Sequence, residues 1–224
     1  QDCLSSVALE CAKECGVLVR IAHSHNSNQD KNIKYIVKRH YMKQIPQFAT
    51  DFFACGKDAG DWMFVGHRYK ILHNAINTSV YTYSSEKAVA IRERLHVGQN
   101  LVIGHVGRFD AQKNHTFLLD IFSECVKIVP NARLLLVGDG EGRTQIQEKA
   151  KSLGLEDKVI FTGVRNDVAD LLQAMDVFVL PSLYEGVPVT MIEAQSSGLP
   201  CVISDGVPKE CVITSGLVTT MRLT

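Results

Sequence analysis

Two glutamates in the segment PSLYEGVPVTMIEAQSSGLPCVIS (181–204) stand where they could hold a ligand that carries hydroxyl groups. If a helix begins at Pro188, Glu185 lies beside its N-terminus, Glu193 lies on its second turn, and Gly186 leaves room for a ligand to approach the backbone. Carboxylates accept hydrogen bonds from sugar or ribose hydroxyls, and the positive end of a helix favours phosphate. Two plainer interpretations stay open: Glu185 complements the helix dipole, and Glu193 is a solvated helix residue.

Two cations occupy the segment GRFDAQKN (107–114), which follows a predicted strand. Arg108 and Lys113 are able to hold a diphosphate, although such residues in a surface loop are usually only solvated. A second loop, GDGEGR (138–143), falls short of the dinucleotide pattern G-x-G-x-x-G because Arg143 stands where the last glycine belongs. A tight turn between strand and helix is favoured there over a phosphate cradle.

From residue 101 onward, short and continuously apolar runs alternate with helical patterns. The predicted strands are 101–107, 133–138, 158–163, 176–181 and 200–204, and the predicted helices are 115–129, 143–154, 166–175 and 188–198. Such runs are typical of strands covered on both faces, so the alternation predicts a parallel, doubly wound sheet. Asn166 is placed to cap a helix, Pro188 suits a first helical position, and Gly154 and Gly198 suit helix ends.

In the first 95 residues, predicted strands and helices also alternate, but less regularly. They predict a helix at 5–16, a strand at 17–25, an amphipathic helix at 30–45, a strand near 51–55 and a polar connector at 73–79. A helix precedes the first strand, and only about twenty residues follow the strand that ends near 204. We therefore expect two Rossmann-like α/β domains in a fragment: an incomplete domain at 1–95 and a second domain, with a truncated C-terminal end, at 96–224.

Composition excludes several classes of protein. The 24 Lys and Arg residues balance 24 Asp and Glu residues, which argues against a long-range field that gathers nucleic acid. No apolar run approaches the length of a membrane span, and the first residues do not resemble a secretion signal. The seven cysteines are scattered without a C-x-x-C pair or a metal-ligand spacing, which predicts a reduced, cytoplasmic protein.

One helical segment, KNIKYIVKRHYMK (31–43), is basic and contains no acidic residue. Its cations are Lys31, Lys34, Lys38, Arg39 and Lys43. A basic amphipathic helix of this kind either rests on anionic lipid, which would place the protein at the inner face of the membrane, or is a solvated helix face; the sequence favours the two equally.

The ordered set GRFDAQKN, LLLVGDGEGR, VIFTGVRNDV and PSLYEGVPVTMIEAQSSGLPCV resembles the nucleotide-sugar-binding domain of retaining family 4 glycosyltransferases, which have the GT-B fold. The earlier segments RIAHSHN, ATDFFACGKDAGDWMF and ILHNAIN resemble the later part of the N-terminal domain in the bacterial exopolysaccharide and capsule branch. The resemblance covers nearly all of the 224 residues.

The resemblance implies roles for particular residues. In the loop that begins at Gly107, Arg108 and Lys113 match the pair that neutralises the donor diphosphate. Glu185 matches the glutamate near the donor sugar, and Glu193 matches the glutamate that binds ribose hydroxyls. The remaining donor-binding positions are the backbone at Gly186 and Val187 and the base-holding turn Thr162, Gly163, Val164 and Arg165. His23 and His25 both match the active-site histidine, and His25 is favoured because His-Asn fits the family pattern.

The function implied is transfer of a sugar, with retention, from a nucleotide-diphosphate donor, UDP-linked, to a polysaccharide or lipid-linked acceptor. Fixed cations can stabilise the leaving diphosphate and no Asp-x-Asp motif is present, so we expect no metal and no cofactor. The family's N-terminal glycine-rich loop and C-terminal helix have no counterpart here, so we expect slow turnover or none. The alternatives are a non-catalytic nucleotide-binding fragment, an epimerase or phosphorylase of the same fold and, third, an NAD-dependent oxidoreductase.

Overall fold

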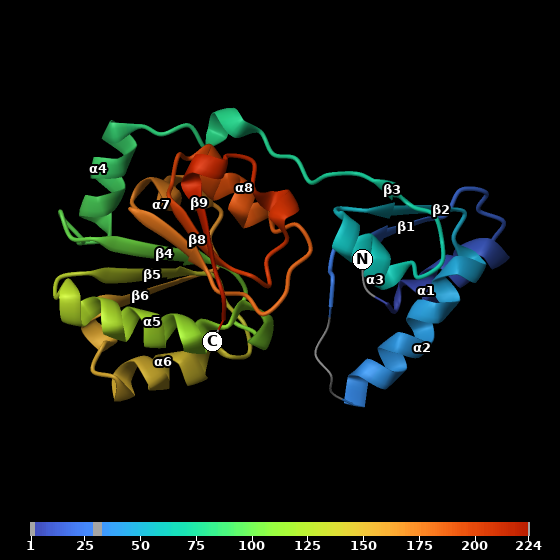
Figure 1. Cartoon of the computed structure of the whole chain (residues 1–224), viewed down its shortest axis with the longest axis horizontal. Helices are drawn as coiled ribbons and strands as arrows, with labels where there is room; N and C mark the ends of the chain where they lie inside the picture. Colours follow the sequence, from blue (N-terminus) through green and yellow to red (C-terminus); the bar gives the residue numbers. More distant parts are fainter. Residues whose placement is uncertain (1–2, 29–32, 224) are drawn as a thin grey trace. The chain divides into compact units, whose positions relative to one another are not determined.

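The computed structural model describes residues 3–28 and 33–223 of the chain, which form two compact units of α/β structure (Figure 1). The first unit comprises Gln1–Asn74 together with Tyr184–Val187, and the second comprises Ala75–Leu183 together with Pro188–Thr224. Each unit has its own parallel sheet and its own core. The predicted α/β class with parallel sheets is confirmed.

The first unit is built on a three-stranded parallel sheet in the order β1-β2-β3. Its elements are α1 (Ser5–Glu14), β1 (Ile21–Ser24), α2 (Ile33–Phe48), β2 (Asp51–Ala54), α3 (Lys57–Met63) and β3 (Lys70–Ile71). Leu9 of α1, Ala22 of β1, Ile45 of α2 and Met63 of α3 pack with Phe64 in one apolar cluster. The sheet and the three helices therefore share a single core.

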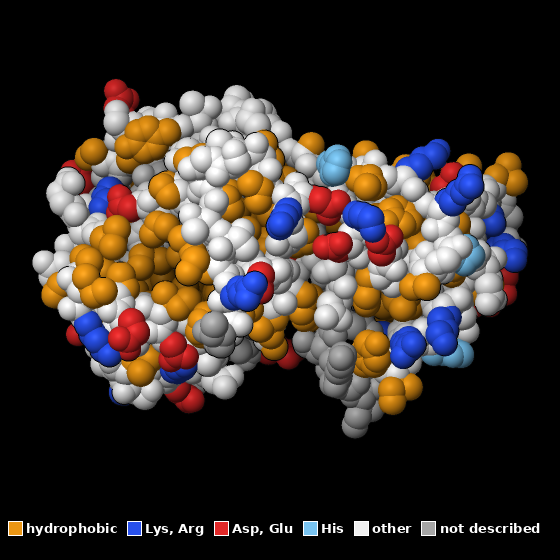
Figure 2. All heavy atoms as spheres, viewed as in Figure 1, with side chains coloured by type: hydrophobic (Ala, Val, Ile, Leu, Met, Phe, Trp, Pro, Cys, Tyr) orange, Lys and Arg blue, Asp and Glu red, His pale blue; other side chains and the backbone are white. Residues whose placement is uncertain are grey.

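One sequence prediction for the first unit differs from the structure. The predicted strand 17–25 shortens to β1, and Leu18 and Val19 before it are exposed. On α2, which is the predicted amphipathic helix, Ile36 and Val37 are 73% and 51% exposed. Figure 2 shows Lys and Arg side chains beside hydrophobic ones over this helix. Lys31 of the basic segment lies outside the described residues.

The second unit contains a six-stranded parallel sheet in the order β6-β5-β4-β7-β8-β9. Its strands are β4 (Val102–Val106), β5 (Arg133–Val137), β6 (Val159–Gly163), β7 (Val177–Leu180), β8 (Cys201–Ser204) and β9 (Val218–Met221). The first five lie within the predicted segments. The sixth was not predicted because VTTM is short and mostly exposed, as an edge strand permits.

Five α-helices accompany this sheet: α4 (Ser85–Arg94), α5 (His115–Ile128), α6 (Arg143–Ser152), α7 (Val168–Gln173) and α8 (Val189–Ser196). Gly154 and Gly198 follow α6 and α8 with φ of 68° and 73°, so the predicted helix ends are confirmed. Pro188 is the N-cap of α8 rather than its first residue. The prediction that Asn166 caps α7 is wrong, because the N-cap is Asp167.

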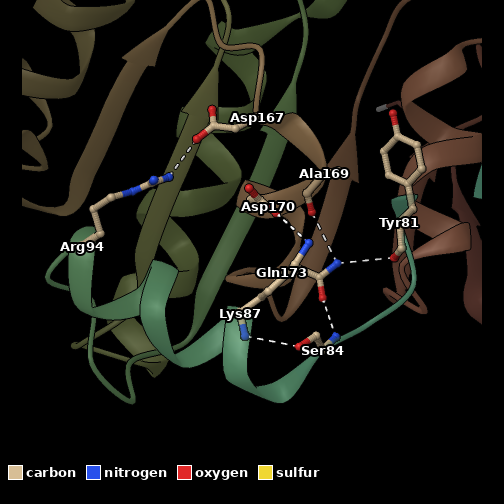
Figure 3. A network of polar contacts seen from close by, with 8 residues as sticks. All are labelled: Tyr81, Ser84, Lys87, Arg94, Asp167, Ala169, Asp170 and Gln173. Atoms are coloured by element: carbon tan, nitrogen blue, oxygen red, sulfur yellow. Dashed lines mark hydrogen bonds and ion pairs between the residues drawn. The ribbon is translucent and has the colours of Figure 1, made fainter. Parts of the chain in front are cut away.

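The connection from residue 75 to residue 95 belongs to the second unit, whereas the sequence predicted a boundary after residue 95. The reason is that α4 packs on α7, where Lys87 Nζ lies 3.3 Å from Asp170 Oδ1 and Arg94 Nη2 lies 2.9 Å from Asp167 Oδ2 (Figure 3). Within the described residues, no helix combines the length and the apolar character that crossing a membrane requires.

Candidate functional site

The centre of the larger sheet marks the place where a ligand would bind. The chain leaves β4 toward β5 and β6 on one side and later returns to β7 on the other, so the carboxyl ends of β4 and β7 form the switch point of the sheet. The loops that follow these two strands are joined: Leu183 N donates to Gln112 O at 2.8 Å, and Asn114 Nδ2 donates to Pro181 O at 3.2 Å.

The loop after β4 carries both predicted cations. Asp110 caps a short 3₁₀ turn by accepting a hydrogen bond from Lys113 N at 3.1 Å, and Arg108 Nε donates to Asp110 Oδ2 at 2.8 Å. The Arg108 side chain is 74% exposed. A Cβ atom on Gly107 would lie 3.2 Å from Cγ and Cδ of Lys113, so the lysine stem runs along this glycine. The structure therefore brings Gly107, Arg108 and Lys113 together on one loop.

The glycine-rich segment 138–143 is the tight turn that the sequence favoured. Gly138 and Gly140 have φ of 135° and 159°. A Cβ on Gly138 would overlap the carbonyl oxygen of Gly107, and one on Gly140 would lie 2.6 Å from Phe109 O. The glycines thus let this turn pack directly against the backbone of the cation loop.

A buried pair of histidines lies beside the cation loop. His105 of β4 and His115 of α5 are 0% and 2% exposed, with ring centroids 4.6 Å apart, and His115 stacks on Phe109 at 4.1 Å. His105 Nδ1 lies 2.8 Å from Val179 O; because a carbonyl only accepts, Nδ1 carries the proton.

The other three ring nitrogens of these histidines have no hydrogen-bond partner in the part of the chain that the structure describes. Burial lowers the pKa of His115 to about 4 and holds the pKa of His105 well below its ordinary value. Sequence reasoning missed the pair, although a histidine inside the apolar run LVIGHVG was a signal.

The predicted ribose-binding glutamate lies on α8, on the other side of the switch point. The half-buried Glu193 accepts a hydrogen bond at Oε1 from the hydroxyl of Tyr81, at 2.7 Å. Burial, and then the adjacent carboxylate, raise the pKa of Tyr81 to about 12. Nothing in the sequence indicated this contact, because the two residues are 112 positions apart.

The predicted base-holding turn ends β6. Gly163 has φ of 72°, and its carbonyl accepts a hydrogen bond from Gly138 N at 2.9 Å, so this turn is tied to the glycine turn after β5. Thr162 is half-buried and Val164 is 77% exposed. Arg165 donates to Asp167, which raises the pKa of Arg165 and holds that of Asp167 well below its usual range.

The remaining predicted residues belong to the first unit. Asn74 Nδ2 donates to Val187 O at 2.7 Å, and a Cβ on Gly186 would overlap the carbonyl oxygen of His25. Glu185 is 5% exposed. The rings of His23 and His25 lie 4.0 Å apart, and burial lowers the pKa of both. Of the two histidines, His25 is therefore the one whose backbone meets the predicted sugar-binding segment.

Residues 100–221 match the model of the family described as glycosyl transferases group 1. The chain belongs to this family. It is 36% identical to EpsF of Bacillus subtilis (strain 168) over 224 residues, which cover 95% of this chain and 58% of that protein. It is 30% identical over 150 residues to the Escherichia coli UDP-Gal:alpha-D-GlcNAc-diphosphoundecaprenol alpha-1,3-galactosyltransferase, a match that covers 65% of this chain and 39% of that enzyme.

Solved structures confirm the GT-B class of fold. HepE from Anabaena, in complex with UDP and glucose, superposes with a TM-score of 0.84 at 23% identity, covering 96% of this chain and 62% of that one. WaaG, a glycosyltransferase involved in lipopolysaccharide biosynthesis, gives a TM-score of 0.77 at 17% identity, covering 96% and 67%. The chain thus spans about three fifths of EpsF and of HepE.

Proposed function

We propose that this chain is the donor-binding part of a retaining glycosyltransferase that takes a sugar from a UDP-linked donor. The observation that carries the proposal is the pair of cations, Arg108 and Lys113, on a loop hydrogen-bonded to the loop after β7 at the switch point of the sheet. Two relatives support the choice of nucleotide, because the Escherichia coli enzyme is named for UDP-Gal and HepE was solved with UDP-glucose.

The chemistry requires that the diphosphate become a good leaving group. We assign this task to Arg108 and Lys113, whose charges oppose the negative charge that develops on the departing diphosphate without help from a metal ion. Glu193 takes the ribose hydroxyls, and the turn Thr162–Arg165 takes the base. In the first unit, Glu185, with the backbone of Gly186 and Val187, takes the sugar.

We assign to His25, or to His23 two residues before it, the place of the active-site histidine, which lies near the donor sugar and the acceptor. The bond from the anomeric carbon to the diphosphate oxygen breaks, and a bond from that carbon to the oxygen of an acceptor hydroxyl forms on the same face, which retains the configuration. The proton of that hydroxyl passes to the departing diphosphate. For the acceptor we propose a polysaccharide or its lipid-linked precursor, by analogy with the diphosphoundecaprenol acceptor in the name of the Escherichia coli relative.

Calorimetric titration of the chain with UDP, ADP and NAD tests the donor assignment. We expect UDP to bind, and we expect Lys113→Gln to weaken that binding about tenfold or more, because a hydrogen bond to a charged group contributes about 1.5–3 kcal/mol. Lys127→Gln is the matched control, since Lys127 lies on α5 in an exposed pair with Glu124. Binding of NAD without UDP, or equal UDP binding by the two variants, would contradict the proposal.

We also propose that α2 contacts an anionic membrane from the cytoplasmic side. A groove of about 440 Å³ on this helix is lined by Tyr35, Ile36, Arg39, His40 and Lys43. Exposed apolar side chains beside cations are what an interfacial helix presents to anionic lipid (Figure 2). The exposed thiols of Cys11 and Cys15 fit a reducing compartment.

Flotation with vesicles of phosphatidylserine and phosphatidylcholine tests the membrane contact. We expect binding that rises with the serine lipid and is lost in the double variant Arg39→Glu, Lys43→Glu. A control with the same charge change, Lys149→Glu, Lys158→Glu, lies in the second unit and should float as the unaltered chain does. Vesicle binding that does not change with the fraction of phosphatidylserine would contradict the proposed membrane contact.

A further inference from the structure

The carboxylate of Glu193 is held by a hydroxyl group of the second unit itself. Its Oε1 accepts a hydrogen bond from the Tyr81 hydroxyl at 2.7 Å, and both side chains are half-buried. Hydrogen bonds to an ionised acceptor are stronger than those between neutral groups. The described residues give the other oxygen, Oε2, no hydrogen-bond partner. One oxygen of the glutamate is therefore fixed by the protein, and the second is left for another donor.

The backbone that carries Tyr81 is itself anchored to α7. Gln173, which is 4% exposed, donates from Nε2 to Tyr81 O at 3.3 Å and accepts at Oε1 from Ser84 N at 2.9 Å. The hydroxyl of Ser84 then caps α4 by accepting from Lys87 N at 3.4 Å. Figure 3 shows these contacts around the side chain of Gln173. Two backbone groups on either side of residues 82–83 are thus fixed by one buried amide.

We infer that Tyr81 is a positioning residue for donor binding: it orients the carboxylate of Glu193 so that Oε2 meets the ribose hydroxyls of the nucleotide. The inference rests on the proposed function, which supplies the nucleotide. Its physical basis is preorganisation, because a glutamate has several rotatable bonds, and ordering it before the ligand binds removes an entropy cost from the binding step. The phenol stays protonated at neutral pH, so it remains a donor.

The variant Tyr81→Phe tests this role because it removes the hydroxyl and keeps the ring. Affinities for UDP and for 2′,3′-dideoxy-UDP, which lacks the ribose hydroxyls, are compared by calorimetry. We expect Tyr81→Phe to weaken UDP binding about fivefold, the equivalent of one net hydrogen bond, and to leave the affinity for the dideoxy nucleotide unchanged. In the background Glu193→Ala, adding Tyr81→Phe should cause no further loss of UDP affinity.

Tyr83→Phe is the matched control, since Tyr83 lies two residues away with a side chain that is 61% exposed. Equal losses for UDP and the dideoxy nucleotide in Tyr81→Phe would show a structural tether and overturn the inference. Unchanged UDP affinity in Tyr81→Phe, with Glu193→Ala impaired, would also overturn it while leaving the donor assignment standing. Failure of the unaltered chain to bind UDP would instead refute the proposed function.

Discussion

Acid should destabilise the second unit through its buried histidines. His115 is 2% exposed, stacks on Phe109, and has a pKa lowered to about 4 by burial, against an ordinary value of 6.5. At pH values between about 4 and 6.5, His115 is protonated in the unfolded chain and neutral in the folded chain, so the unfolded chain binds more protons. The contribution of His115 to stability is therefore present above pH 6.5 and is lost as the pH falls toward 4.

The size of this effect follows from the two pKa values. For one group titrating at 6.5 when unfolded and at about 4 when folded, the free energy of unfolding falls by about 2 kcal/mol between pH 7 and pH 5. His115→Phe removes the titrating ring and keeps an aromatic ring against Phe109. Between pH 7 and pH 5, the free energy of unfolding of the variant should therefore fall by about 2 kcal/mol less than that of the unaltered chain. His105 is present in both proteins, so its titration does not account for the difference.

Hydrogen exchange measured by mass spectrometry at pH 7 and pH 5 can check this difference, because peptides from β4 and β5 report the opening of the second unit alone. The comparison uses protection corrected for the intrinsic pH dependence of exchange. A variant that loses as much protection as the unaltered chain would refute the reasoning, since it would show that a protonated His115 is accommodated in the fold.

Two further predictions concern the packing beside the site. Gly138→Ala should destabilise the second unit by about 1–3 kcal/mol in thermal unfolding and weaken UDP binding, because φ at this position is 135° and the new methyl would push against the carbonyl of Gly107; Gly216→Ala, which meets nothing within 4 Å, should be neutral. Gln173→Leu should cost about 0.5–1.5 kcal/mol for each of the two hydrogen bonds that it removes from the half-buried backbone of Tyr81 and Ser84. Gln147→Leu, on the exposed face of α6, should leave the stability unchanged. If either Gly138→Ala or Gln173→Leu unfolded at the same temperature as the unaltered chain, the prediction for that variant would be wrong, because the local backbone would have relaxed around the new side chain.

The strands and helices of the second unit were readable from the sequence for a physical reason. A parallel strand covered on both faces must be apolar along its whole length, so runs such as RLLLVG are locally distinctive. The same information failed at β9, a short and mostly exposed edge strand. The sequence of a segment shows which residue types it contains, but it does not show which other parts of the chain pack against it.

Some features of the candidate site could be predicted from the sequence and others could not. Arg108 and Lys113 were predicted as candidates from the sequence because they follow a predicted strand, and Glu193 because it lies on a helix that follows another strand. The contact of Tyr81 with Glu193 and the pairing of His105 with His115 were not. These contacts depend on how strands are ordered in the sheet and how a connecting segment is anchored.

By itself, the sequence determined the alternation of strands and helices, the residue types available at the carboxyl ends of the strands, and the family. Only the tertiary structure decided that residues 75–95 pack with the second unit, that β4 and β7 are neighbours, and that a tyrosine holds the acidic side chain. The reason is that secondary structure follows from periodicity within a few residues, whereas a contact across 112 positions exists only after the sheet has assembled.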